Sequence, residues 1–121
     1  MLSLTPIGQI TLSRGDTLHL PIEINQGTAL NPIRYDLAEK DEVYFGLMEP
    51  NQPWELAILK KKYTLADTYN GQIIIDLKPK DTMCLYPGLY YYQVKVRIYD
   101  EANDDFIVNT IIPKTHFWIE E

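Results

Sequence analysis

The chain has 121 residues, of which 45% are hydrophobic and 12% aromatic, so it can bury a core of its own. Its formal net charge of −6 argues against nucleic acid as a partner, because phosphate binding requires clustered lysine and arginine. No apolar run reaches the roughly 18 residues of a membrane span, and the start of the chain lacks the basic and apolar regions of a signal peptide. A single cysteine, Cys84, excludes an internal disulfide. These features predict one domain, over residues 1–121, that is made and assembled inside the cell.

A first short strand is predicted at Ile10 and Leu12, where apolar and polar residues alternate with the period of two that β-strands have. A turn at Arg14, Gly15 and Asp16 follows, since glycine permits a positive φ and aspartate accepts local backbone hydrogen bonds. Integrins read the same tripeptide in other proteins. At a strand junction, in a chain without a secretion signal, we interpret it as a structural corner.

The second strand, at 17–24, carries its apolar residues on one face. Pro21 removes a hydrogen-bond donor from the ladder, so this strand is predicted to lie at an edge or to carry a bulge. A long connection rich in asparagine, glycine and proline follows at 25–40. A third strand is predicted at 42–48, and the loop at 49–53 ends it because two prolines cannot continue a ladder.

The fourth strand is predicted at 55–61. Its residues 56–59 are apolar on both faces, which indicates that a loop or another subunit covers them. Asn70-Gly71 is a strong turn signal, and a fifth strand follows at 73–77. The connector from Pro79 to Leu85 is predicted to begin with one helical turn.

The longest strand starts after Pro87-Gly88 and alternates an apolar face, led by Tyr90, with a mixed face that carries Tyr91 and Tyr99. An acid shortly before a Gly-x-Tyr at the start of a strand is the pattern of the corner in immunoglobulin-like sandwiches, where a tyrosine hydroxyl bonds to upstream backbone. We assign that hydroxyl to Tyr90, two residues after Gly88. The predicted corner residues are Arg14, Gly15, Asp16, Asp81, Gly88 and Tyr90.

A polar hairpin loop is predicted at 100–105, a return strand at 106–112, an interruption at Pro113-Lys114 and a last strand at 115–120. Seven or eight short strands with regularly spaced turns predict an all-β, immunoglobulin-like antiparallel β-sandwich. Strands this short bury a core only when two sheets stack about 10 Å apart.

No residue pattern predicts an enzyme, a metal site or a cofactor. His19 and His116 lie far apart and lack the close ligand pairs of zinc sites. Cys84 has no recognisable base beside it, so we interpret it as a packed thiol. The acidic loop at 100–105 has neither the spacing nor the glycine of a calcium loop, which favours a solvated loop.

The alternation turns several aromatic residues away from the core. Exposed tyrosine and tryptophan are typical of a protein interface or a sugar platform, because they offer large area and few rotors to freeze. Cross-strand aromatic pairs that stabilise an exposed sheet face are an equal alternative. The apolar run at 56–59 favours protein contact over sugar. The candidate interface residues are Leu59, Tyr44, Trp54, Tyr91 and Tyr99.

Several short motifs occur in a fixed order along the chain. They are Ile10-Thr11-Leu12-Ser13-Arg14-Gly15-Asp16-Thr17, Tyr35-Asp36-Leu37, Asp81-Thr82, Leu85-Tyr86-Pro87-Gly88-Leu89-Tyr90-Tyr91-Tyr92-Gln93-Val94 and Phe117-Trp118-Ile119. This ordered set resembles the immunoglobulin-like modules in structural proteins of tailed bacteriophages and prophages, such as the N-terminal domain of siphophage upper baseplate proteins. The chain departs from that family at Gln93, where aspartate is usual, and in having no downstream coiled coil or receptor-binding domain.

The resemblance implies a non-enzymatic virion protein of the tail, baseplate or head surface, made in the cytoplasm of a bacterial host. It implies a free-standing module that binds itself and other virion proteins and uses no cofactor, nucleic acid or membrane. The alternative is a carbohydrate-binding adhesion module that uses the exposed aromatics, and a weaker one is an accessory domain of a hydrolase.

Overall fold

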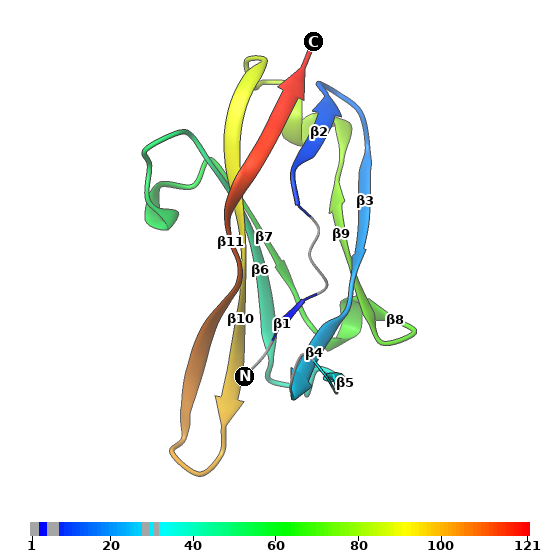
Figure 1. Cartoon of the computed structure of the whole chain (residues 1–121), viewed down its shortest axis with the longest axis vertical. Helices are drawn as coiled ribbons and strands as arrows, with labels where there is room; N and C mark the ends of the chain where they lie inside the picture. Colours follow the sequence, from blue (N-terminus) through cyan, green and yellow to red (C-terminus); the bar gives the residue numbers. More distant parts are fainter. Residues whose placement is uncertain (1–2, 5–7, 28–29, 31) are drawn as a thin grey trace.

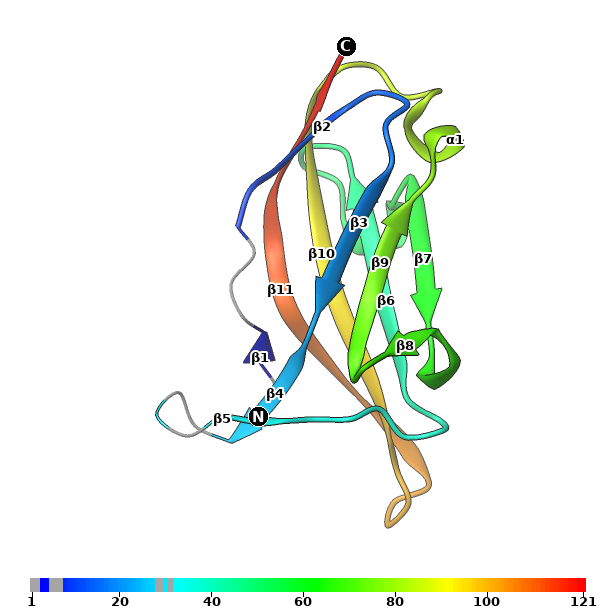
Figure 2. The same cartoon turned by 90° about the vertical axis from the view of Figure 1, so that its right-hand side faces the viewer.

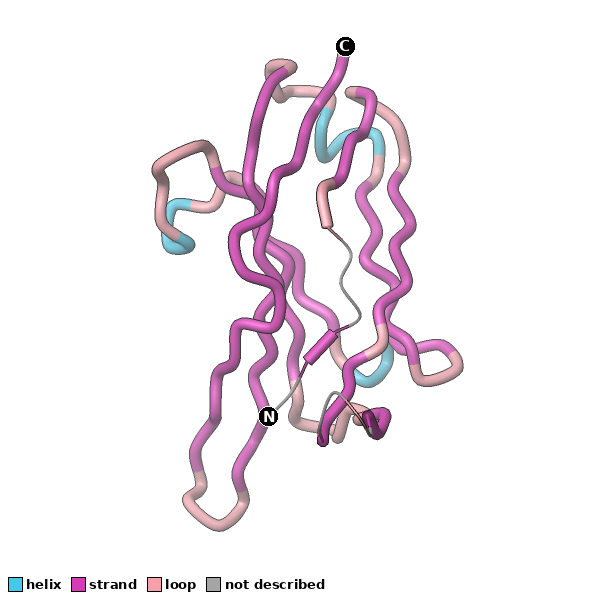
Figure 3. Tube along the Cα trace, in the orientation of Figure 1, coloured by secondary structure: helices cyan, strands magenta, loops and turns pink. Residues whose placement is uncertain are grey.

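The computed structural model describes residues 3–4, 8–27, 30 and 32–121, and most of them lie in β-strands (Figure 1, Figure 3). One sheet has the order β2 (Ile10–Ser13), β11 (Asp105–Glu120), β10 (Gly88–Asp100), β6 (Glu42–Met48) and β7 (Leu59–Tyr63). A second has the order β3 (Leu18–Ile22), β9 (Gln72–Leu77) and β8 (Thr68–Tyr69). A third, smaller sheet has the order β1 (Ser3–Leu4), β4 (Ile24–Gly27) and β5 (Pro32–Arg34).

The five-stranded sheet and the three-stranded sheet built on β9 face each other, with the core between them (Figure 2). Their ladders are antiparallel, except that β2 runs parallel to β11 with Ile10 opposite Phe117. The chain changes sheet after β1, β2, β3, β5, β7 and β9, so β2 pairs with β11, β6 with β10 and β3 with β9 although these strands are far apart in sequence. This is an all-β, immunoglobulin-like sandwich with eight strands in its two facing sheets, as the sequence predicted.

The core is formed by the alternate side chains that the strands send between the sheets. Three fully buried aromatic rings meet at its centre: Phe45 stacks on Tyr92 with centroids 5.8 Å apart, and Phe117 meets Phe45 edge-on at 6.5 Å. From the facing sheet, Ile75 and Leu77 belong to the same buried cluster. Removing this apolar surface from water is the main force that holds the two sheets together.

Two hydrogen bonds build the corner at which β10 begins. The Tyr90 hydroxyl donates to the backbone carbonyl of Tyr86 at 2.8 Å, which is the geometry of a tyrosine corner. Gly15 has a φ of 84°, and its backbone N–H donates to the Thr82 hydroxyl at 3.0 Å. Because Thr82 ends the short helix α1 (Pro79–Thr82), this bond ties the turn after β2 to the connector before β10.

The remaining corner candidates have separate local roles. The backbone N–H of Arg14 donates to the carbonyl of Glu120 at 2.6 Å, and that of Asp16 donates to the carbonyl of Ser13 at 3.0 Å. Asp81 holds α1: its carboxylate accepts the backbone N–H of Lys78 at 2.7 Å. Gly88 begins β10 with a φ of 149°.

The fourth predicted strand starts later than expected. Residues Trp54–Leu56 form a 3-10 turn, η1, so β7 begins at Leu59 and not at residue 55. Leu59, expected at the interface, lies opposite Leu47 in the ladder and packs against the core. That prediction is therefore corrected: the exposed apolar residues here are Leu56 and Ile58, with 59% and 41% of their surface accessible.

The predicted interruption at Pro113-Lys114 is instead a bulge within one long strand. Tyr92 pairs with Thr115 and Val94 pairs with Ile112, so residues 113–114 lie opposite a single residue of β10. Proline is tolerated there because a bulged residue is unpaired and donates no ladder hydrogen bond.

The connection predicted at 25–40 also contains more structure than expected. Within its described part, β4 and β5 pair through Asn25 and Arg34, and the backbone N–H of Tyr35 donates to the carbonyl of Ile24 at 2.7 Å. Pro21 lies in β3, an edge strand of the described β3–β9–β8 sheet, as predicted. A second 3-10 turn, η2 (Leu65–Asp67), links β7 to β8.

Candidate functional site

The outer face of the five-stranded sheet, away from the core, carries the main concentration of charged and aromatic side chains among the residues described. Register explains it: Lys95 of β10 lies opposite Tyr44 of β6, which lies opposite Lys62 of β7. Arg97 lies opposite Glu42 on one side and Val108 on the other. Because residues two apart share a face, the strands bring these side chains together although they are far apart in sequence.

Trp54 covers the middle of this face. The loop between β6 and β7, which extends outward from the sheet in Figure 1, folds back through a hydrogen bond from the Ile58 backbone N–H to the Leu47 carbonyl at 2.8 Å. The Trp54 ring then lies over Gly46, where a Cβ would stand 2.3 Å from the ring. Gly46 is thus required because it lets the indole lie against the sheet backbone.

Two lysine amines lie over the same ring. The Nζ of Lys95 is 4.8 Å from the Trp54 centroid, and the Nζ of Lys60 is 5.2 Å from it, both within cation–π range. A hollow of about 280 Å³ opens beside the ring. We call it the Trp54 hollow, and it is lined by Tyr44, Trp54, Lys60, Lys95, Val96, Arg97 and Val108.

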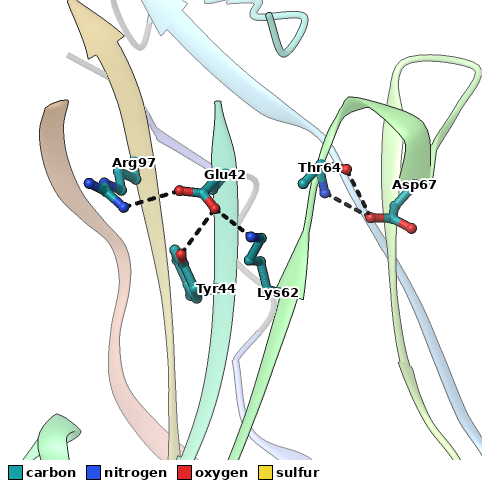
Figure 4. A network of polar contacts seen from close by, with 6 residues as sticks. All are labelled: Glu42, Tyr44, Lys62, Thr64, Asp67 and Arg97. Atoms are coloured by element: carbon teal, nitrogen blue, oxygen red, sulfur yellow. Dashed lines mark hydrogen bonds and ion pairs between the residues drawn. The ribbon is translucent and has the colours of Figure 1, made fainter. Parts of the chain in front are cut away.

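Glu42 organises the charges at the rim of the hollow (Figure 4). Its carboxylate pairs with Lys62 at 2.9 Å and with Arg97 at 3.2 Å, and it accepts the Tyr44 hydroxyl at 3.2 Å. The hydrogen bond from Lys62 is the main reason that the pKa of Glu42 lies below its ordinary value. The second contact in Figure 4, between Thr64 and Asp67, caps η2 and belongs to a different part of the chain.

The other aromatic candidates form separate pairs. Tyr91 meets His116 edge-on at 5.2 Å, and His116 meets Trp118 at 6.3 Å. Further along β10, Tyr99 meets Phe106 at 5.3 Å.

Cations also lie over these rings. The Nζ of Lys40 is 4.2 Å from the Tyr99 centroid, and the Cζ of Arg97 is 3.7 Å from the Phe106 centroid. The structure thus brings Tyr44 and Trp54 together in the hollow, while Tyr91 and Tyr99 lie in cross-strand pairs outside its lining.

Sequence reasoning missed the cations of the hollow. Lys60 and Lys62 project from the outer face of β7, beside Trp54 and Tyr44. Lys95 and Arg97 share the predicted face of Tyr91 and Tyr99, and this shared face was the signal that could have found them.

Another missed residue is Asp41, which is 1% exposed. It accepts hydrogen bonds from the Tyr35 hydroxyl at 2.5 Å, the Ala38 backbone N–H at 2.9 Å and the Tyr99 backbone N–H at 3.1 Å. Its role is to join the connection before β6 to β10.

Within the described residues, no group of three or more His, Cys, Asp or Glu side chains is placed to hold a metal ion. The helical turns described are all too short to cross a membrane. A second hollow of about 200 Å³ lies against β4 and β9, lined mainly by apolar residues such as Ile22, Leu37 and Ile73.

No family model matches the chain, and no curated protein matches it. Among solved structures, the chain is similar to AggA, the major subunit of aggregative adherence fimbriae type I from Escherichia coli. The two are 12% identical with a TM-score of 0.33, over 98% of this chain and 93% of the AggA chain. A likeness this weak says nothing about partners or activity.

Proposed function

We propose that the protein is a non-enzymatic structural module of a tailed phage or prophage virion, in the tail, baseplate or head surface. Its mechanism is protein–protein contact through the outer face of the five-stranded sheet. The virion assignment is supported by the ordered motifs from Ile10 to Ile119. The module would be made in the cytoplasm of the bacterial host and bind both itself and neighbouring virion proteins.

The observation that supports contact is the Trp54 hollow with exposed apolar residues near it. Leu56 and Ile58 follow Trp54 in the sequence, and Val108 of the hollow lining is 60% exposed. Tryptophan, tyrosine and arginine are the residues enriched at interface centres, and Trp54, Tyr44 and Arg97 all line this hollow.

Contact through a face is favoured over contact through a sheet edge. The β3 edge carries Pro21, which cannot donate to an added strand, and the β7 edge carries three consecutive lysines, 60–62. Proline and lysine on edge strands are the devices by which β-proteins avoid edge-to-edge pairing.

The experiment is to purify virus particles from an induced culture of the source strain on a density gradient and to search the particle band for peptides of this chain by mass spectrometry. We expect the chain to sediment with the particles, and an Ile58→Asp variant to be incorporated less. The matched control is Met83→Asp, which makes the same change at another exposed apolar residue, at the α1 end of the molecule. Particles that lack the chain would overturn the proposal.

The alternative, a carbohydrate-binding module, requires free ring faces. Lys60 and Lys95 lie over Trp54, and Lys40 lies over Tyr99, so the cations compete with sugar for these rings. Binding on a glycan array that is lost in Trp54→Ala would support this alternative and count against protein contact.

A further inference from the structure

The chain is acidic overall, yet the Trp54 hollow is strongly basic. Three cations, Lys60, Lys95 and Arg97, line it, and Glu42 at its rim pairs with Arg97 and with Lys62 of the neighbouring strand. Among the described residues, the ion pairs do not include Lys60 or Lys95, whose amines lie over the Trp54 ring. The hollow therefore has uncompensated positive charge beside an apolar floor and fits an acidic partner that carries some apolar surface.

A segment with that chemistry exists in the same chain. The tip of the β10–β11 hairpin contains Asp100, Glu101, Asp104 and Asp105 and has no lysine or arginine. We call residues 100–105 the acidic tip. The hairpin extends well beyond the rest of the sandwich (Figure 1, Figure 2), and next to the tip Ile107 is 50% exposed.

The acidic tip is ordered by its own hydrogen bonds. The Asp100 carboxylate accepts the Ala102 backbone N–H at 3.1 Å and the Asn103 side-chain amide at 2.7 Å. Asp104 has a φ of 48° and accepts the Tyr99 hydroxyl. An ordered loop loses less conformational entropy on binding than a flexible one.

The tip cannot reach the hollow of its own molecule. Both lie on the same β10–β11 ribbon, and the ladder stays paired from Lys95 and Thr110 out to Asp100 and Asp105. Folding the tip back onto Lys95 would break this ladder. An occupant from this chain must therefore come from another copy.

We propose that the acidic tip of one copy docks in the Trp54 hollow of a second copy. This rests on the contact face of the proposed function and names its partner. Because tip and hollow lie on one ribbon, two copies placed antiparallel about a two-fold axis make the same contact twice, which gives a closed dimer.

The test uses two charge-reversed variants of the full chain. The hollow variant is Lys60→Glu with Lys95→Glu, and the tip variant is Glu101→Lys with Asp105→Lys, which keeps the bonds of Asp100 and Asp104. Two matched controls make the same charge changes at exposed sites elsewhere: Lys78→Glu with Lys80→Glu, and Glu120→Lys with Glu121→Lys. Circular dichroism of each variant shows whether it is folded.

Light scattering and analytical ultracentrifugation then give the mass of each protein. We expect the wild type to dimerise, more weakly as salt rises, since the charges are at the surface. Each reversed variant alone should have a dissociation constant raised at least about tenfold, because the hollow variant sets glutamates against the acidic tip and the tip variant leaves the tip with no net negative charge. An equimolar mixture of the two should form a heterodimer, since the lysines introduced at 101 and 105 then meet the glutamates introduced at 60 and 95, and the other contact is that of the wild type.

Three results would overturn the inference: a wild type that stays monomeric at all concentrations, variants that dimerise like the controls, or a mixture that does not restore assembly. These results leave the particle experiment unaffected, so the two proposals fail separately. A monomer found in virions would point to another virion protein in the hollow. A dimer absent from virions would overturn the virion role and leave the self-contact standing.

Discussion

Asp41 is a buried aspartate that accepts hydrogen bonds from three separate parts of the described chain. Its carboxylate satisfies three donors from three places: a hydroxyl of the connection, a backbone N–H just before β6 and a backbone N–H of β10. Burying a charge is favourable only when such partners are present, so the three bonds and the burial must be kept together.

Asp41→Ala should lower the free energy of unfolding by about 2–3 kcal/mol, because it leaves buried donors without an acceptor. Asp41→Asn should cost less, since its amide oxygen can still accept. Urea unfolding measures both, and Asp16→Ala, at an exposed aspartate, is the control that should change stability by less than about 0.5 kcal/mol. Equal effects at the two positions would contradict the role of Asp41.

Gly46→Ala tests the packing of the Trp54 ring against the backbone at Gly46. A Cβ at residue 46 would stand 2.3 Å from the ring, so the indole must leave the sheet. In a Trp118→Phe background, Trp54 emission should shift to the red, because the ring becomes more exposed to water. Combining Gly46→Ala with Trp54→Ala should remove most of the stability cost of the glycine change, and an unshifted emission spectrum would count against the arrangement.

At the scale of elements, alternation was enough to predict the strands whose burial is regular. The third strand at 42–48, the turn at Asn70-Gly71 and the apolar face led by Tyr90 all appear where predicted. The predicted start of the fourth strand was wrong because the apolar residues at 56–59 suggested a covered strand, whereas Leu56 and Ile58 are exposed and precede the strand. Residue identity alone does not tell an apolar side chain that faces the core from one at the surface.

The candidate site was only half predictable for a related reason. Alternation placed Tyr44 and Tyr91 on an outer face, but the hollow depends on which strands are neighbours. Lys60 and Lys95 meet over Trp54 only because β6 separates β7 from β10, and that strand order is set by long-range packing. The bulge at Pro113 was missed similarly, since only the paired strand reveals it.

The ion pair between Lys61 of β7 and Asp81 of α1 joins the five-stranded sheet to the connector that follows β9. Its atoms are 2.8 Å apart, and both side chains are partly buried. Asp81→Ala should cost about 1 kcal/mol, because α1 also loses its cap at Lys78. A double-mutant cycle with Lys61→Met isolates the ion pair, whose coupling should be about 0.5–1 kcal/mol. Zero coupling would show that the cap alone matters.

For the whole molecule, acid should lower the free energy of unfolding, and protonation of Glu42 and Asp81 should contribute most of the loss. Lys62 lowers the pKa of Glu42, and the pKa of Asp81 is also lowered because bonds from Lys61 and the Lys78 backbone outweigh the opposing effect of burial. A carboxylate with a lowered folded-state pKa stabilises fully above its unfolded pKa of about 4, and the stabilisation is lost as pH falls through the lowered value. Unfolding free energy should therefore fall below about pH 4.

Thermal unfolding from pH 7 down to pH 2 measures this loss. Glu42→Gln combined with Asp81→Asn should be less stable at neutral pH and should show a flatter acid limb. Glu120→Gln, at an exposed carboxylate, should leave the slope unchanged. A double variant with the slope of the wild type would place the acid sensitivity elsewhere.

The strand order has a consequence for how the protein folds during synthesis. β10, the central strand of the five-stranded sheet, and its neighbour β11 leave the ribosome after the other described strands, and β2 finds its parallel partner only in residues 117–120. Until then β6 and β7 can pair, but the buried residues Val43, Phe45 and Leu47 lack the side chains of β10 that pack beside them in the core. A nascent chain stalled before residue 88 would expose these side chains and depend on chaperones. The five-stranded sheet is complete only after β11 has been synthesised.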